Sequence, residues 1–264
     1  MRVDIGPLES GYFPVADLTT GTTSHLEAEL ARQGQGYPEM DVRTQAAFFV
    51  NEYAWYLAMA TAAPLLSHQR APDVAPENVA LRISRYTWHE DGASGEAERY
   101  DVRFRSGRFA CLASDPAANH PDATSLQDTD ALLAWLRGRI ETHFAPLIAR
   151  VHAISHLSQS ALWRLVADAY AGQALNVGKH TGQVERAQTL GLALIKADKS
   201  PLSNPQTGYI TLTCAGYTDT FRERGGCCRY YTVAEDGDKC GTCVLRPPEN
   251  RKQWFLDHMT RTSA

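Results

Sequence analysis

The sequence predicts an α+β fold, in which a small antiparallel sheet and a helical, bundle-like body precede a cysteine-rich segment near the C-terminus. Three observations support this prediction. Apolar residues recur at helical spacing over long stretches such as 129–154, and β-branched and aromatic residues nearly alternate over 79–89. Four cysteines are concentrated between Cys227 and Cys243, after the helical stretches.

Composition limits the class of protein. The chain has 264 residues, of which 44% are hydrophobic and 21% charged, which suits one large domain or two small ones. The net charge of −4 offers no basic field for nucleic acid or an anionic membrane. Residues 1–18 lack the pattern of a secretion signal, and no apolar run is long enough to span a membrane. We expect a cytoplasmic protein with no nucleic-acid partner and no membrane span.

The first half of the chain mixes helix and strand. Residues 24–32 predict a short helix, and aromatic and aliphatic residues over 44–66 predict a long one that Pro64 ends or kinks. Strands are expected over 79–89 and 100–114. In the second of these, Ser106 and Gly107 supply a turn that would pair 102–104 with 109–111 in an antiparallel sheet. The polar stretch 115–128 is predicted to be a loop.

The second half is mainly helical. Helices are expected over 129–154 (with Pro146 a break), over 158–175 with Ser158 as the N-cap, and over 181–197. A strand at 208–214 leads into the cysteine segment, and a helix at 248–259 would pack back through Trp254 and Phe255. The expected domains are an N-terminal α+β region, 1–125, and a helical region, 126–264, which contains the cysteine segment 222–246.

The cysteine segment carries the functional argument. In a reducing cytosol, clustered cysteines indicate metal binding or catalysis rather than structural disulfides. Cys240 and Cys243 form a C-x-x-C chelate with Gly241 in its turn, and Cys227–Cys228 supply a second pair after Gly225 and Gly226. Two glycines here would allow the chain to approach the metal closely. Four thiolates are the ligand set that suits zinc or an iron–sulfur cluster.

The spacing of the two pairs helps to choose between these metals. Structural zinc sites usually combine two chelates of similar C-x₂₋₄-C spacing. Adjacent cysteines such as Cys227 and Cys228 chelate a single small ion poorly, because their side chains diverge. A binuclear iron cluster offers two iron atoms and tolerates other arrangements. The spacing therefore favours iron–sulfur and leaves zinc open.

A family resemblance strengthens the iron–sulfur interpretation. Cys227–Cys228, eleven residues, and then Cys240-Gly-Thr-Cys243 resemble the C-C-x₁₀-C-x₂-C motif of the FhuF family of ferric-siderophore reductases. Further features resemble the family as well. These are Arg222 and Arg224 before the pair, Arg229-Tyr230 after it, Ala161-Leu162-Trp163-Arg164, and Ser200-Pro201-Leu202.

The resemblance implies a [2Fe–2S] cofactor whose metal and cofactor ligands are Cys227, Cys228, Cys240 and Cys243. It also implies the activity, which is transfer of one electron to Fe(III) in a siderophore, with release of Fe(II) in the cytoplasm. The hydroxamate type is the siderophore expected first. The spacer departs from the family pattern by one residue. An insertion in the polar loop 235–238 should cost little free energy.

The expected partners follow from the same interpretation. A ferric siderophore is the substrate, and a ferredoxin or a flavin reductase is the expected electron donor, because no dinucleotide-binding G-x-G-x-x-G motif is present. The candidates for contacting the substrate are Arg222, Arg224, Arg229, Tyr230 and Tyr231. The candidates for offsetting the cluster's charge are the same three arginines together with Lys239 and Arg246. Two other functions stay open, namely a zinc-stabilised binding module and an iron–sulfur carrier or sensor without a siderophore site.

Other reactive residues have structural interpretations. Cys111 and Cys214 are each expected to be small buried residues. His152 and His156 have the i, i+4 spacing of a metal chelate, but capping or solvent exposure is the preferred interpretation. Trp163 lies at helical spacing among Leu162 and Leu165 and is expected in the core. Tyr230 and Tyr231 could instead alternate in a short strand.

Overall fold

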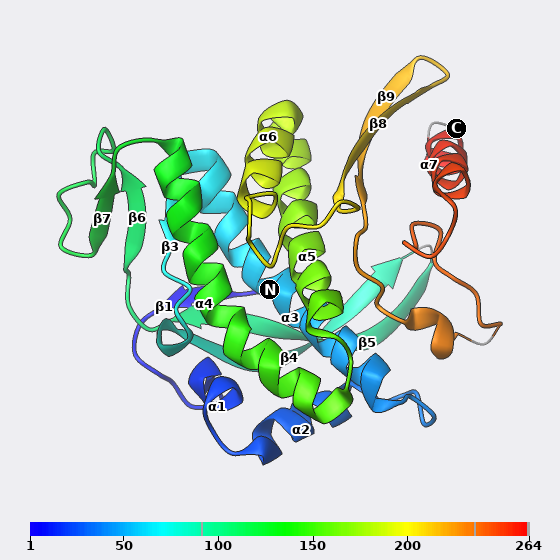
Figure 1. Cartoon of the computed structure of the whole chain (residues 1–264), viewed down its shortest axis with the longest axis horizontal. Coiled ribbons are helices and arrows are strands. Elements are labelled where there is room, and N and C mark those ends of the chain that lie inside the picture. The colour runs from blue at the N-terminus through cyan, green and yellow to red at the C-terminus, as the bar shows by residue number, and fades with distance from the viewer. Residues whose placement is uncertain (91, 235, 263–264) are drawn as a thin grey trace. The chain divides into compact units, whose positions relative to one another are not determined.

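The structure, a computed structural model, describes residues 1–90, 92–234 and 236–262 (Figure 1). The chain forms two compact units. The first contains Met1–Leu26 and Tyr56–Leu147, and the second contains Glu27–Trp55 and Ile148–Ala264. The divisions fall within three helices, α2 (Thr23–Gln33), α3 (Val42–His68) and α4 (Thr129–Ser155). The sequence-based domain boundary at 125/126 stays a prediction.

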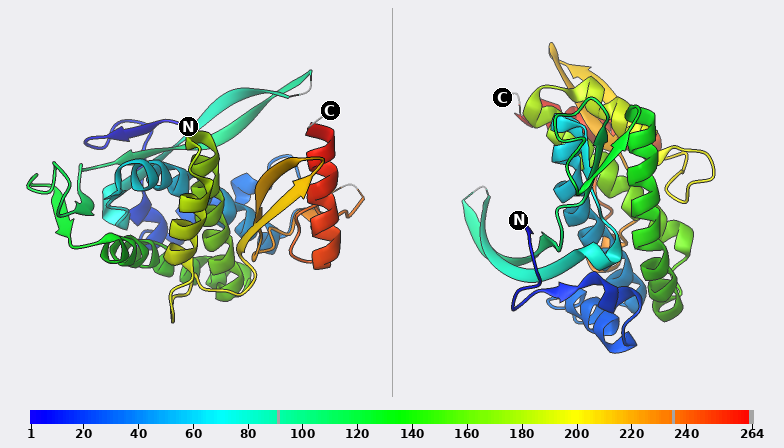
Figure 2. Two further views of the ribbon diagram at one scale, coloured as in Figure 1. Left: turned by 90° about the horizontal axis from the view of Figure 1, so that it is seen from above. Right: turned by 90° about the vertical axis from the view of Figure 1, so that its left-hand side faces the viewer.

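The first unit contains two small sheets. The four-stranded sheet has the order β1-β5-β4-β2, and the three-stranded sheet has the order β3-β6-β7. Their strands are β1 (Val3–Ile5), β2 (Phe13–Pro14), β3 (Arg70–Pro72), β4 (Val79–Glu90), β5 (Ala93–Phe104), β6 (Phe109–Leu112) and β7 (Ala123–Leu126). Figure 2 shows β4 and β5 as a long, curved hairpin. A short helix, α1 (Val15–Thr19), and a 3₁₀ turn, η1 (Pro76–Asn78), complete the connections.

The expected pairing across Ser106–Gly107 is wrong. β5 pairs with β4 and with β1, whereas β6 pairs antiparallel with β3 and parallel with β7. The buried Asn78 explains the difference, because its side-chain oxygen accepts hydrogen bonds from the backbone N–H and the hydroxyl of Ser106 (2.9 and 2.7 Å). These bonds end the hairpin and direct the chain into another sheet. β7 also lies within 115–128, which the sequence predicts to be a loop.

Neither internal proline ends its helix, so the break expected at Pro146 is wrong, and so is the helix end considered at Pro64. A kink at Pro64 stays a prediction. α3 continues past Pro64 to His68, and α4 continues past Pro146 to Ser155. A proline removes one backbone hydrogen bond of a helix and crowds the preceding turn. The residues that follow, Leu65 and Leu147, are buried, and this burial offsets the lost bond.

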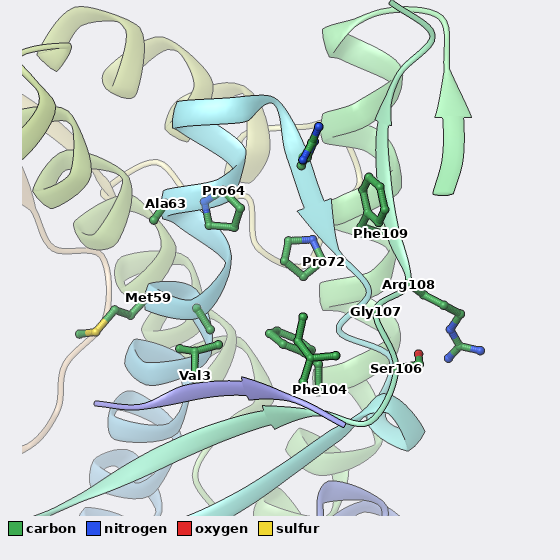
Figure 3. Close-up of a pocket in the computed structure, with 13 residues that line it drawn as sticks. Val3, Met59, Ala63, Pro64, Pro72, Phe104, Ser106, Gly107, Arg108 and Phe109 are labelled. Carbon is green, nitrogen blue, oxygen red and sulfur yellow. The ribbon is translucent and has the colours of Figure 1, made fainter. Parts of the chain in front are cut away.

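The first unit also contains an apolar cavity of about 560 Å³ (Figure 3). Met59, Ala63 and Pro64 of α3 lie on one side of it, and Pro72 and Phe104 lie on the other. Its volume is within the range of small-molecule sites. The thirteen lining residues include no thiol, histidine or carboxylate, so this cavity offers no metal ligand of those types.

The second unit joins two packed helices to a hairpin and a terminal helix. α5 (Gln159–Thr181) begins after the N-cap Ser158, as predicted, and packs along α6 (Val184–Ile195). The hairpin consists of β8 (Gly208–Cys214), whose bounds match the prediction, and β9 (Tyr217–Glu223). α7 (Pro248–Thr262) lies beside the hairpin in Figure 1. Among its described residues, no helix of the chain is both long and apolar enough to cross a membrane.

α7 is fixed to the hairpin by apolar contacts. Phe255 and Met259 are buried with Leu212 of β8, and the rings of Phe255 and Phe221 stack at 4.5 Å. The expectation that Phe255 packs back is confirmed. Trp254 also packs back, against Gly241 of the C-x-x-C turn, although 37% of it is exposed. Tyr230 and Tyr231 form a 3₁₀ turn, η2 (Tyr230–Thr232), so the short strand considered for them is wrong.

Candidate metal centre

The four clustered cysteines lie in two loops of the second unit. Cys227 and Cys228 follow β9, and Cys240 and Cys243 precede α7. Burial raises the pKa of the Cys227 and Cys240 thiols, and the neighbouring thiols of Cys228 and Cys243 raise both further. Because each of these two thiols is affected by a member of the other pair, the loops bring the two pairs close together.

The thiols are not arranged around a single point. In the described ranges, no three His, Cys, Asp or Glu side chains form a group that could hold one metal ion. The separation of the cysteines into two pairs is nevertheless compatible with a binuclear group, in which each metal atom takes its own ligands.

Asp168, in the middle of α5, fixes the first cysteine pair. Its side chain is fully buried, with 0% exposure. One carboxylate oxygen accepts hydrogen bonds from the N–H of Gly225 (2.8 Å) and the hydroxyl of Thr207 (2.7 Å), and the other accepts from the N–H of Gly226 (2.9 Å). A carboxylate that accepts three such bonds is well satisfied in the interior. Asp168 therefore anchors the two residues that precede Cys227.

The two glycines are required by close packing against protein. A Cβ atom on Gly226 would lie 2.9 Å from the backbone nitrogen of Leu165, and one on Gly225 would lie 2.9 Å from that of Thr207. Each distance is too short for a real contact. These glycines therefore allow a close approach to α5 and to the turn at Thr207, and the close approach to the metal that the sequence predicts stays a prediction.

Arg224 links the two cysteine pairs. Its side chain is 11% exposed, and its Nη1 donates to the sulfur of Cys240 at 3.7 Å. Its Nε lies 3.8 Å from a carboxylate oxygen of Asp168. Burial alone would lower the pKa of Arg224, but Cys228, which also accepts a hydrogen bond from it, and Asp168 raise it. A guanidinium thus lies between the thiols, where it offsets thiolate charge.

Arg222 is directed into the protein. Its Nη1 donates to the backbone oxygen of Asp168 (2.7 Å), and its guanidinium lies 5.6 Å from the centre of the Trp55 ring. Burial lowers its pKa. Gly172 makes room for this arrangement, because a Cβ atom there would lie 2.7 Å from Arg222 and 2.8 Å from Trp55.

Arg229 connects the first pair to the start of α3. Its φ of 62° places it in the left-handed region, and its N–H points to the sulfur of Cys227 (3.4 Å). Its guanidinium donates to Asp41 (2.9 Å) and to the hydroxyl of Thr44 (3.0 Å). Tyr230 then stacks on Phe48 at 6.5 Å. The loop after Cys228 is therefore held in place by the hydrogen bonds of Arg229 and by the stacking of Tyr230 on Phe48.

The second pair is held by local contacts. The N–H of Cys243 donates to the oxygen of Cys240 (2.9 Å), which closes the C-x-x-C turn. Arg246 Nε donates to the same oxygen (3.1 Å). A Cβ atom on Gly241 would overlap the indole ring of Trp254, so the turn packs directly against α7.

The predicted site residues are thus partly explained. The structure places the four cysteines in two neighbouring loops, and their joint role as cluster ligands stays a prediction. Arg222 and Arg224 make interior contacts, and 43% of Tyr230 is exposed. A substrate contact for these two arginines, for Arg229 or for Tyr230 and Tyr231 stays a prediction. In the loop 235–238, Glu235 lies outside the described residues.

Sequence reasoning missed Asp168. A single charge in the middle of the otherwise uncharged stretch 165–174 was the available signal. The structural interpretations of Cys111 and Trp163 are confirmed by their burial. His152 Nδ1 lies 2.9 Å from the backbone oxygen of Leu157, just beyond the end of α4, and His156 is exposed, as expected. Cys214 is partly rather than fully buried.

The donor set and its surroundings fit an iron–sulfur cluster. Four thiols in two pairs, a guanidinium between them and a backbone N–H directed at sulfur supply soft ligands and offset negative charge. These features place the chain in the class of thiolate-ligated metalloproteins.

Two family models identify the chain more closely. Residues 47–206 match the ferric iron reductase FhuF-like transporter model, and residues 224–245 match the FhuF 2Fe-2S C-terminal domain. The first match covers more than half of the chain, and the chain belongs to this family. The cofactor is a [2Fe–2S] cluster, which decides against zinc. A comparison with curated proteins gave no match.

Proposed function

We propose that the chain is a ferric-siderophore reductase that delivers one electron to Fe(III) in a siderophore and releases Fe(II) in the cytoplasm. The proposed ligands of its [2Fe–2S] cluster are Cys227, Cys228, Cys240 and Cys243. The observation that carries this proposal is the match to a ferric iron reductase family and its 2Fe-2S domain, within which Arg224 contacts one thiol of each cysteine pair.

The chemistry explains why one electron is sufficient. Siderophores hold Fe(III) through hard oxygen donors, and these bind Fe(II) far more weakly. The bound cluster supplies a single electron. Reduction therefore converts tightly held iron into iron that another ligand can remove. We propose a hydroxamate siderophore as the first substrate to test.

The protein's own residues have two proposed tasks. Asp168 and Arg224 hold the first cysteine pair and keep a positive charge beside the thiolates, and Arg229 directs its N–H to Cys227. Such contacts stabilise the more negative, reduced state. The proposed electron donor is a separate protein, either a ferredoxin or a flavin reductase.

Anaerobic mixing tests this function. The protein is reduced with dithionite, freed of excess reductant and mixed with a ferric hydroxamate and an Fe(II) chelator. We expect the visible spectrum of the oxidised cluster to return while the Fe(II)–chelator complex forms in a 1:1 ratio of electrons to iron. A cluster that stays reduced would favour the alternative, an electron carrier or sensor without a siderophore site.

A further inference from the structure

A second cavity, of about 370 Å³, borders the C-x-x-C turn. It lies within the second unit, between this turn and α7. Its lining residues are Lys239, Gly241, Arg246, Asn250, Gln253, Trp254 and Asp257. Gly241 lies between Cys240 and Cys243 in sequence, so this cavity is next to two of the proposed cluster ligands.

The lining is rich in hydrogen-bond donors. Lys239 and Arg246 are cations, and Asn250 and Gln253 carry side-chain amides, whereas Asp257 is the one carboxylate among the seven lining residues. The amide of Gln253 donates to that carboxylate (2.8 Å), which engages part of its acceptor capacity. The cavity therefore presents more positive than negative charge to a ligand.

Trp254 gives the cavity a flat apolar face. Its ring stacks on His258 with a centroid distance of 5.5 Å and an interplanar angle of 2°, and it also packs against Gly241. These contacts fix the orientation of a large side chain that is 37% exposed. Exposed, fixed aromatic residues with polar neighbours are typical of ligand-contacting surfaces.

A ferric chelate has complementary chemistry. Its iron is surrounded by oxygen atoms that accept hydrogen bonds, and the arms of its organic ligand are apolar. Lys239 and Asn250 can donate to such oxygens, and Trp254 can contact an apolar arm. Electron transfer falls steeply with distance, so a chelate must dock close to a cluster ligand, and this cavity lies there.

We propose that this cavity docks one face of the ferric chelate, and that it selects oxygen-rich chelates of neutral or negative charge over positively charged ones. The inference rests on the proposed function and adds to it a location and a charge preference. During reduction, Fe(III) gains one electron and the reduced protein loses one, and no covalent bond of the protein forms or breaks.

Gallium chelates test docking without electron transfer. Ga(III) has the charge of Fe(III) and nearly its size, but it is not reduced under these conditions. Calorimetry would measure binding of three Ga(III) hydroxamates, one neutral, one anionic and one cationic, to the oxidised holoprotein. We expect Lys239→Glu to weaken binding of the anionic chelate by about tenfold and to strengthen binding of the cationic chelate.

Lys252→Glu is the matched control, because Lys252 is exposed on α7 and is not a lining residue of the cavity. It makes the same charge change and should alter each affinity by less than about twofold. A gain of affinity for the cationic chelate cannot result from misfolding, and an unchanged visible spectrum would show an intact cluster.

The outcomes separate this inference from the proposed function. Equal effects of the two substitutions, or no effect of Lys239→Glu on any chelate, would overturn the docking site. Wild-type protein that binds the gallium chelates as expected but does not reduce the ferric ones would overturn the reductase and leave the docking site supported.

Discussion

The two cysteine pairs are held in different ways. The first pair, Cys227–Cys228, is fixed by the buried carboxylate of Asp168, which is distant in the sequence, and by the nearly buried guanidinium of the neighbouring Arg224, which lies beside that carboxylate. The second pair, Cys240 and Cys243, is fixed by hydrogen bonds within its own turn and by one aromatic contact with α7. One half of the metal centre therefore depends on tertiary structure, and the other half depends mainly on local structure.

This difference bears on the length of the spacer. The eleven residues between Cys228 and Cys240 contain η2 and a turn with Gly237 at a φ of 65°. Because the second pair carries its own hydrogen bonds, it can shift as a unit when the spacer changes length. The extra residue relative to the family motif can then be accommodated without moving the first pair.

The largest expected effect is the loss of a cluster ligand. Cys→Ser at 227, 228, 240 or 243 should abolish or strongly change the visible absorption of the purified protein, because an alcohol is a poor ligand for iron in such clusters. The same substitution at Cys111 or Cys214 should leave the spectrum intact. A bleached Cys214→Ser variant beside an unchanged Cys227→Ser variant would show that the ligand set is wrong.

Asp168→Asn should have the next largest effect. An amide cannot satisfy the two N–H groups and the hydroxyl that now donate to the carboxylate, and Arg224 would lose its buried partner. Loss of one member of such a network typically costs about 3 kcal/mol. Thermal unfolding and the cluster content per chain would measure this effect, with the exposed Asp198→Asn as control. Equal values for both variants would contradict the anchoring role.

Arg224→Gln should lower the reduction potential. Removal of a positive charge between the pairs makes addition of an electron less favourable, and for a one-electron couple a tenfold change in the equilibrium constant corresponds to about 59 mV. We expect a fall of some tens of millivolts in a spectroscopic titration, with Arg224→Lys intermediate. The exposed Arg261→Gln should leave the potential unchanged. A higher potential in Arg224→Gln would contradict the electrostatic role.

Gly241→Ala tests how the second cysteine pair, Cys240 and Cys243, is held in place. The added Cβ would overlap the Trp254 indole, and overpacking of this kind typically costs about 1–3 kcal/mol. Cluster loss on mild heating should therefore be faster than in the wild type. Trp254→Ala combined with Gly241→Ala should restore part of the stability, since it removes the overlapping ring. A double variant no better than the single one would exclude this contact as the cause.

Asp41→Asn should have the smallest effect. Burial alone would raise the pKa of Asp41, but hydrogen bonds from Thr44 and the charge of Arg229 outweigh it and lower the pKa. The carboxylate therefore stabilises the fold above its unfolded pKa, and this contribution is lost only as pH falls through the lower folded pKa. Because 51% of the Asp41 side chain is exposed, its ion pair with Arg229 should contribute less than about 1 kcal/mol to the free energy of unfolding.

The lowered pKa of Asp41 also predicts how the effect of Asp41→Asn on stability depends on pH. The difference in melting temperature between wild type and Asp41→Asn should be constant between pH 8 and pH 5 and should shrink at high salt. A difference that already disappears at pH 5 would mean that the pKa of Asp41 is raised rather than lowered.

Sequence patterns predicted the structural features that are determined by residues close together in the chain. The N-cap at Ser158, the strand 208–214 and the C-x-x-C turn all follow from local chemistry. The Asn78–Ser106 hydrogen bonds and the contact of Asp168 with Gly225 join residues that are 28 and 57 positions apart, and no local pattern specifies them. The cysteines of the site were therefore predictable, whereas their main anchor was not.

Electron paramagnetic resonance of the dithionite-reduced protein, combined with iron and sulfide analysis, tests whether two thiolate pairs hold a binuclear cluster. We expect a spin-½ signal of a reduced [2Fe–2S] centre, with iron and acid-labile sulfide present in equal amounts and two of each per chain. Stoichiometric zinc, or iron without sulfide, would contradict the account.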